Sequence, residues 1–257
     1  MRCGLLAAAL AAIGCSLGFP AASQETKPAE PAVTLVRTVK VGDVRVMKVS
    51  ATADVYGTEV VLERTLRTEV KEIKDTGEVV TVVRDTGGKV NAGGQELDIP
   101  DTGPITVTAD KLGRMVKYER PAADMAILGA EVEQLLAIMQ DYILSDKAVK
   151  PGEEWKNELP NPAFKDKKVQ VKTTFVGMDK LDDAPVWKIR QSVVAPLDAN
   201  EGKMTADLVF LADPANGHPR VIEGAIKGLP TQYGTVDLKL KATQVPAEKS
   251  KPAETPK

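Results

Sequence analysis

Apolar and polar residues alternate over most of this chain, and this period of two is the feature that most constrains its fold. In the longest run, Val60, Leu62, Leu66 and Val70 share one face, and Glu59, Glu63, Arg67, Glu69 and Lys71 share the other. Successive side chains of a β-strand point to opposite faces of a sheet, so such a run predicts a long strand with one wet face. The same alternation predicts strands at Val44–Val55, Val79–Arg84, Ile105–Ala109, Met115–Tyr118, Val169–Val176, Val186–Val194, Met204–Leu211, Val221–Ile226 and Gly234–Ala242.

Short segments rich in glycine and aspartate separate these runs. They are Gly42-Asp43, Asp75-Thr76-Gly77, Asp85-Thr86-Gly87-Gly88, Ala92-Gly93-Gly94 and Leu112-Gly113-Arg114. Glycine supplies the positive φ that tight hairpins need, and aspartate favours turns. The segments therefore predict hairpins, and the strands are expected to form an antiparallel meander.

One segment, from Ala122 to about Leu144, departs from the alternation. Its apolar residues fall within an arc of about 120° at helical spacing, and they are Leu128, Val132, Leu135, Leu136, Met139, Tyr142 and Ile143. Pro121 suits the first turn of a helix. The predicted fold class is thus mainly β (α+β): a long antiparallel curved sheet or half-barrel with one central amphipathic helix near residues 122–144.

The N-terminus has the pattern of a secretory signal peptide at residues 1–23. One cation, Arg2, precedes an apolar run from Leu5 to Ile13, and Gly18 to Pro20 interrupt the pattern after it. The apolar run is much shorter than the roughly 20 residues that cross a bilayer, so no transmembrane segment is expected. The chain is predicted to be exported to a periplasmic or extracellular location.

Two processing sites compete for this leader. Ala21 and Ser23 are the small residues that precede a signal-peptidase cut before Gln24, which would release a free protein. Alternatively, the segment Ala12 to Cys15 resembles a bacterial lipoprotein signal, in which Cys15 would become lipidated and anchor the chain to the envelope. Both forms remain open at this point.

The remaining chain predicts one domain between two tails. Residues 24–32 and 246–257 contain little to bury and are expected to be a disordered linker and a disordered tail. Residues 33–245 are expected to form a single β-rich domain, a length at which β-sandwiches and barrels are often single units. The chain has only two cysteines, Cys3 and Cys15, so no disulfide is expected in the mature domain.

The usual chemistries of enzymes have few residues to use in this sequence. His218 is the only histidine, lies in a turn-rich run, and is interpreted as a solvated side chain without a role. No metal or other cofactor is expected. Three Asp-Thr-Gly triplets, at Asp75, Asp85 and Asp101, would be the catalytic pair of an aspartic protease only in buried apolar surroundings, so they are interpreted as turns. A hydrolase using carboxylates remains the alternative, because sequence cannot show whether two of them meet.

Charge and aromatic content argue against some classes of binding partner. The formal net charge is −2, with both signs interspersed, so nucleic acid is not an expected partner. Aromatic residues are 4% of the chain, which disfavours stacking platforms for sugars or single strands. Trp155 and Trp187 are interpreted as core anchors.

The order of elements resembles exported bacterial β-rich domains of unknown function. The features that carry this resemblance are the signal peptide, the one-faced strands, the helix and the segment Pro151-Gly152-Glu153-Glu154-Trp155 that opens the second group of strands. More distantly, it resembles the half-barrel lipoprotein-carrier superfamily. That resemblance implies an unclosed barrel with a helical lid over a cavity for acyl chains or other apolar ligands.

The sequence therefore predicts a non-enzymatic exported binding or carrier protein with an apolar small molecule as the expected ligand. The predicted ligand wall is the helix face of Leu128, Val132, Leu135, Met139 and Ile143. The alternative is a structural or protein-interaction domain of the cell envelope whose partner binds a sheet edge.

Overall fold

The alternating segments form one antiparallel sheet in the computed structural model, which describes residues 31–99, 101, 103–120, 129–197, 202–231 and 234–246. Within these residues the elements are β1 (Val44–Val55), β2 (Thr58–Ile73), β3 (Val79–Ala92), β4 (Gln95–Ile99), β5 (Ile105–Ala109), β6 (Met115–Glu119), α1 (Ala130–Ile138), β7 (Glu154–Pro160), β8 (Lys168–Leu181), β9 (Ala184–Pro196), β10 (Lys203–Ala212), β11 (Pro219–Thr231) and β12 (Gly234–Val245). The mainly β, antiparallel fold is confirmed.

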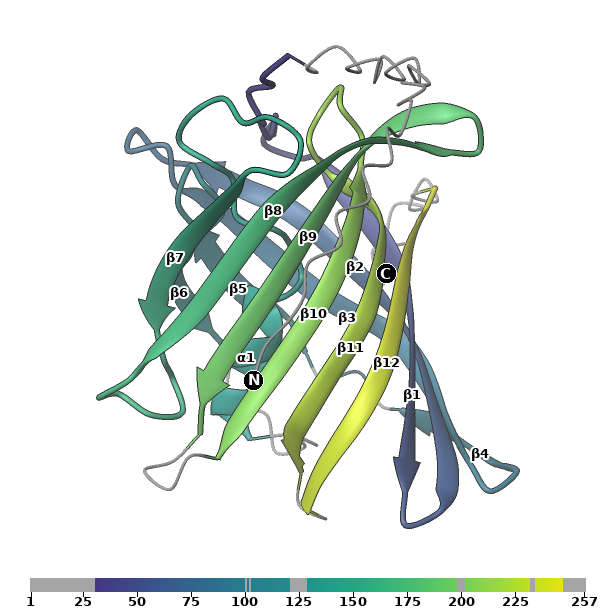
Figure 1. Cartoon of the computed structure of the whole chain (residues 1–257). Helices are drawn as coiled ribbons and strands as arrows, with labels where there is room; N and C mark the ends of the chain where they lie inside the picture. The colour runs from purple at the N-terminus through teal and green to yellow at the C-terminus, as the bar shows by residue number, and fades with distance from the viewer. Residues whose placement is uncertain are drawn as a thin grey trace, which may run out of the picture. The chain divides into compact units, whose positions relative to one another are not determined.

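The sheet curls into a nearly closed, barrel-like surface. Its strand order is β6-β5-β3-β2-β1-β12-β11-β10-β9-β8-β7, and β4 pairs with β3 beside this path. The pairing of β1 with β12 joins the strands before the helix to those after it. Figure 1 shows β2, β3, β5 and β6 behind β7 to β12, with α1 in view between them. Among the described strands, β6 and β7 are the two edges between which the barrel stays open.

The helix is shorter than the sequence predicts. It ends at Ile138, whereas the apolar spacing predicts a helix to about Leu144; residues 121–128 lie outside the described part. In a longer helix, the backbone N–H groups of residues 139–144 would donate to helix carbonyls. Two of these groups instead donate to the sheet and its loops. The Ile143 N–H donates to the Gln191 side chain at 2.9 Å, and the Leu144 N–H donates to the Leu112 carbonyl at 2.8 Å.

The hydrophobic core occupies one half of the curled sheet. It joins α1 and the segment Met139–Val149 to the inner side chains of β7 to β11, with Phe175, Ile189 and Phe210 almost fully buried. Met47 and Ala242 extend the core to β1 and β12. Among the described residues, no member of this core cluster lies on β2 to β6. Buried residues do occur on β2 to β5 outside this cluster, but they are fewer than on β7 to β11: Val70, Val83, Asp85, Ile99 and Thr108.

Two predicted hairpins are wrong. Gly42 and Asp43 precede β1, the first of the described strands, so they do not join two strands. Asp85 to Gly88 lie inside the long strand β3, not between two strands, and Asp85 is only 5% exposed. The register between β2 and β3 shifts at this place: Leu66 faces Asp85, whereas Arg64 faces Gly88. A β-bulge uses the same residue types as a turn, and Gly87 has the positive φ of +117° that it requires.

Other sequence interpretations are confirmed. Asp75 lies in the turn between β2 and β3. The Gly103 N–H donates to the Asp101 carboxylate at 2.8 Å, but Thr102 lies outside the described residues, so the turn at Asp101 stays a prediction. Trp187 is 5% exposed in the core, and Trp155 packs on the core with its indole N–H donating to the Ile143 carbonyl at 3.0 Å.

Two strands, β4 and β7, were not predicted from the sequence. Both are short and rich in polar residues.

The domain boundaries stay predictions. The described residues belong to a compact unit that begins at Pro31. The predicted limits at residues 23, 32 and 245 are not tested by this fold. In the described part of the chain, no helix has both the length and the apolar character needed to span a bilayer.

Candidate functional site: an apolar strip and an arginine cluster inside the sheet

The inner face of the sheet follows from the core residue Met47. Side chains two residues apart on a strand share a face, so Val49 and Ala51 point inward with Met47. The pairing register carries this face to the neighbouring strands, because Met47 faces Leu66, and Ala51 faces both Leu62 and Leu240. Leu238 faces Ala53 and lies on the same side. These assignments define the inward strip: Val49, Ala51, Leu62, Leu66, Leu238 and Leu240.

The inward strip is apolar but only half-buried. All six of its side chains have intermediate exposure, whereas inner side chains across the sheet, such as Val193 and Leu208, are fully buried. Val49, Leu238 and Leu240 touch the border of the core cluster. The strip therefore continues the apolar surface of the core across β12, β1 and β2 without the helix to cover it.

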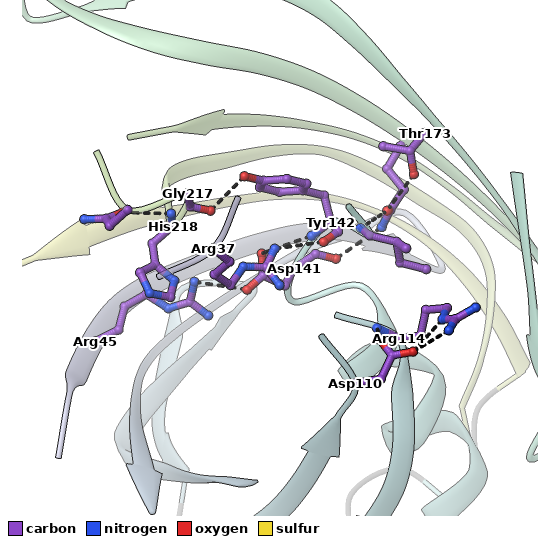
Figure 2. A network of polar contacts seen from close by, with 12 residues as sticks. Arg37, Arg45, Asp110, Arg114, Asp141, Tyr142, Thr173, Gly217 and His218 are labelled. Atoms are coloured by element: carbon purple, nitrogen blue, oxygen red, sulfur yellow. Dashed lines mark hydrogen bonds and ion pairs between the residues drawn. The ribbon is translucent and has the colours of Figure 1, made fainter. Parts of the chain in front are cut away.

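A charged cluster lies at one end of this strip, beside the first residues of β1. The Arg37 guanidinium donates to the Asp141 carboxylate at 2.7 Å and to the Tyr142 carbonyl at 2.8 Å, and it lies 4.9 Å from the centre of the Tyr142 ring. Arg45, on β1, reaches the other oxygen of Asp141 at 3.4 Å. Figure 2 shows both arginines and Asp141 together, with the His218 ring beside Arg45. We call Arg37, Arg45, Asp141 and His218 the arginine cluster.

Hydrogen bonds fix this cluster to the fold. The Tyr142 hydroxyl donates to the Gly217 carbonyl at 2.7 Å. The buried Gln191 side chain accepts hydrogen bonds from the Ile143 N–H and the Thr173 hydroxyl, and it donates to the Asp141 carbonyl at 3.2 Å. These contacts join the segment after α1 to β8, β9 and the loop before β11. The cluster is thus held by groups that come from distant parts of the chain.

The electrostatics of the cluster leave a surplus of positive charge. Two arginines face one aspartate, and arginine remains charged at every physiological pH. Burial lowers the pKa of His218 from its ordinary value, and Arg45 and Arg37 lower it further while Asp141 opposes them. His218 is therefore neutral at pH 7. Burial also raises the pKa of Tyr142, so its hydroxyl stays protonated.

His218 is not the solvated side chain that the sequence analysis expected. It is half-buried, and its Nδ1 atom is buried with no hydrogen-bond partner among the described residues. The loop that carries it turns inward because Gly217 lies against the N-terminal segment: a Cβ atom on Gly217 would come within 2.0 Å of the Val36 carbonyl oxygen.

Two further ion pairs lie near the inner face. Arg64, on the inner side of β2, pairs with the buried Asp85, and Arg120 pairs with Glu133 of α1. Burial lowers the pKa of Arg64, and the charge of Arg120 adds to this effect, while Asp101 opposes it. In each pair one cation meets one carboxylate, so these pairs are internally neutral.

The predicted ligand wall is part of the solid core. Val132, Leu135, Met139 and Ile143 are all buried and belong to one core cluster with the inner residues of β7 to β11. Leu128 and the proposed lipidation residue Cys15 lie outside the described residues. A ligand would reach these four side chains only if the helix moved, so their role as a wall stays a prediction.

Two grooves on the sheet are lined by other residues. The larger has a volume of about 810 Å³, and its lining includes Lys48, Ser50, Glu63, Lys89 and Lys241. By the alternation on β1, Lys48 and Ser50 point away from the face of Met47, so this groove opens mainly on the outer face. The smaller groove lies between β2, β3 and β4 and includes Glu59 and Asn91. Neither groove contains a residue of the predicted wall or of the arginine cluster, whereas Val49 of the inward strip lines the larger one.

The sequence contained a signal for part of this site. Arg45 and Arg64 occupy inward positions of strands whose other inward residues are mostly apolar, and such an interruption marks a charge directed at the interior. Arg37, Asp141 and His218 carry no such signal, because only the fold brings together residues as far apart in the chain as Arg37 and Asp141. Among the described residues, no three histidine, cysteine, aspartate or glutamate side chains gather in a possible metal site.

The chain was compared with protein families, with curated proteins and with solved structures. No protein-family model and no curated protein matches the chain. Among solved structures, the chain is similar to the one titled "Lipid-protein interactions in lipovitellin", with 9% identity and a TM-score of 0.47. The match covers 83% of this chain but 27% of that chain, so this chain spans about a quarter of its neighbour's length.

Proposed function

We propose that this chain is an exported, non-enzymatic protein that binds an apolar ligand on the inward strip. The observation that carries the proposal is the uneven cover of the inner face. The inner residues of β7 to β11 are sealed by α1 and the segment after it, whereas Val49, Leu62 and Leu240 stay half-buried on the same curled surface. A ligand lying along β12, β1 and β2 would complete the cover that the helix provides on the other side.

The expected driving force is the burial of apolar surface. Fully burying one large aliphatic side chain is worth about 1.5–3 kcal/mol relative to leaving it exposed, and the strip holds six apolar side chains in partial contact with water. The curled sheet holds these side chains in place before the ligand arrives, so little order has to be created on binding. The strip therefore has the character of a preformed apolar site.

The proposal of a non-enzymatic role is supported by the polar groups near the strip, which already form hydrogen bonds or ion pairs within the protein. Tyr142, Gln191 and Asp141 are occupied by hydrogen bonds or ion pairs that hold the fold. The Nδ1 atom of His218 has no hydrogen-bond partner among the described residues, so no nucleophile is hydrogen-bonded to this atom there. Most covalent hydrolases place a nucleophile beside a general base.

Export is proposed from residues 1–23, which have the pattern of a signal peptide. A periplasmic or extracellular protein that binds an apolar molecule would move it through water or keep it from the membrane. Lipidation at Cys15 would instead hold the same domain at the envelope.

The test is the uptake of an apolar fluorescent dye by the purified protein and by a matched pair of variants. Leu62→Gln places an amide on the inward strip, and Val61→Gln places the same amide on the adjacent outer position of β2. We expect dye fluorescence to rise with the wild type and Val61→Gln, and to fall at least tenfold in affinity with Leu62→Gln. Equal binding by the two variants, or no uptake by the wild type, would contradict the proposal.

The alternative of an envelope interaction protein has one observation in its favour. The barrel is open between β6 and β7, and an open edge offers unpaired backbone groups to a partner strand. However, both edges carry charges, with Lys117 and Glu119 on β6 and Glu154, Lys156 and Glu158 on β7. Charged edge strands resist pairing with other chains, so the apolar-ligand proposal is the stronger one.

A further inference from the structure

Arg45 is the residue that most needs an explanation beyond the fold. It lies at the start of β1 and, by the alternation from Met47, points to the same inner face as the inward strip. Its side chain is 16% exposed. Its one ion pair among the described residues is the 3.4 Å contact with Asp141, which is long for a charge-assisted hydrogen bond. A guanidinium has five N–H donors, so most of those of Arg45 are not used by this contact.

The neighbours of Arg45 do not supply the missing acceptors. Asp141 already receives a short contact from Arg37, so one carboxylate serves two arginines. The Nε atom of Arg37 is a donor that is buried without a hydrogen-bond partner among the described residues. Unsatisfied buried donors are costly, and a surplus of donors and positive charge in one place is what an anion would satisfy.

We propose that the ligand of the inward strip is an amphiphile whose anionic head group, a carboxylate or a phosphate, pairs with Arg45. The proposal rests on the proposed function, because it assigns a head group to the apolar ligand of the same site. The head lies at the arginine cluster. Because Met47 is buried in the core, the apolar tail runs beside it, past Leu66 of β2, toward Val49 and Ala51.

The geometry of β1 separates the two ends of such a ligand. A strand rises by about 3.3 Å per residue, so the backbone distance from Arg45 to Val49 is about 13 Å, and Ala51 lies about 7 Å further. Met47 fills the inner position between Arg45 and Val49 and belongs to the core. The inner face of this strand thus changes from charged to apolar in one direction, which matches the polarity of a lipid with an acidic head.

The other arginines near the strip fit this role less well. Arg64 lies in the middle of the inner face of β2 and is neutralised by Asp85, whose carboxylate is nearly fully buried. Arg120 is paired with Glu133. Arg37 holds Asp141 and the Tyr142 carbonyl, so it is a positioning residue of the cluster. Arg45 is the member whose charge is least satisfied by the protein.

The experiment compares two probes that differ only in the head group: a long-chain fatty acid and the fatty alcohol of the same chain length. Each displaces an apolar dye from the purified protein at a pH where the acid is ionised. A charge-assisted pair is worth about 1.5–3 kcal/mol, which corresponds to a preference for the acid of about tenfold to more than a hundredfold. We expect Arg45→Gln to remove this preference while the alcohol binds as before.

Three controls make the result specific. Arg45→Lys keeps the charge and is expected to keep most of the preference for the acid. Lys48→Gln removes a cation from the exposed outer side of the same strand and is expected to change neither probe. Since the pairing of Arg37 with Asp141 does not depend on Arg45, Arg45→Gln is expected to keep the circular dichroism and the melting behaviour of the wild type.

The outcomes separate this proposal from the proposed function. Equal affinity for acid and alcohol in the wild type would overturn the anionic head group and leave the apolar site standing. Binding of neither probe would overturn the proposed function itself. Inorganic phosphate forms a third arm: if it binds in an Arg45-dependent way while both long-chain probes fail, the cluster is a site for a free anion and the amphiphile is refuted.

Discussion

Replacing Gln191 by leucine tests how the segment after α1 is held. Gln191 is fully buried and forms three hydrogen bonds, with the Ile143 N–H at 2.9 Å, the Thr173 hydroxyl at 3.1 Å and the Asp141 carbonyl at 3.2 Å. Leucine fills nearly the same volume, but it cannot form these hydrogen bonds, so the three partner groups lose them. Each buried group left unsatisfied costs about 1–3 kcal/mol, and the added apolar contact offsets part of this, so we expect a net loss of about 3–5 kcal/mol.

Urea denaturation followed by circular dichroism measures this loss as a shift of the midpoint at constant slope. Thr173→Val is the matched control, because it removes one of the three hydrogen bonds from the same site and is expected to cost about 1 kcal/mol. The double variant should lose less than the sum of the two single variants, since they share this bond. A loss below 1 kcal/mol for Gln191→Leu would refute the view that this side chain anchors the segment.

Three other changes probe the same end of the sheet. Tyr142→Phe deletes the hydrogen bond to the Gly217 carbonyl and should lower the free energy of unfolding by about 1 kcal/mol in urea; an unchanged midpoint would contradict this. Gly217→Ala should lower the melting temperature by several degrees, because the new Cβ collides with the Val36 carbonyl oxygen, and a wild-type melting curve would contradict it. Stability should fall as the pH drops below about 6.5, since the unfolded chain takes up a proton that the lowered pKa of His218 resists in the fold. His218→Gln should reduce this dependence, and an unaltered pH profile would show that other groups cause it.

The sheet could be predicted from the sequence because burial acts on alternate residues of a strand. The predicted limits of the strand at Val44–Val55 agree with β1, whose inner residues meet the core or the inward strip. The prediction failed at Asp85 because a bulge within a long strand and a turn between two strands draw on the same aspartate and glycine. The local sequence does not show whether the strand ends before Asp85 or continues through Gly88.

The end of the helix and most of the arginine cluster depend on distant contacts. The apolar spacing continues to Leu144, but the backbone donors of Ile143 and Leu144 are taken by Gln191 and Leu112. No pattern within the segment indicates those acceptors. In the cluster, Arg45 could be detected in the sequence as a charge on an apolar face. Its ion pair with Asp141 could not, because that contact depends on the pairing of β1 with β12 and on the turn of the chain after α1.

Native mass spectrometry of the protein isolated from the cells that make it tests the central claim most directly. If the inward strip binds an apolar ligand, the spectrum will show a noncovalent adduct that is released on denaturation, and Leu62→Gln will lose this adduct while Val61→Gln keeps it. If the wild type carries no adduct and also takes up no long-chain acid or alcohol when these are added, the strip is not a ligand site and the account is contradicted.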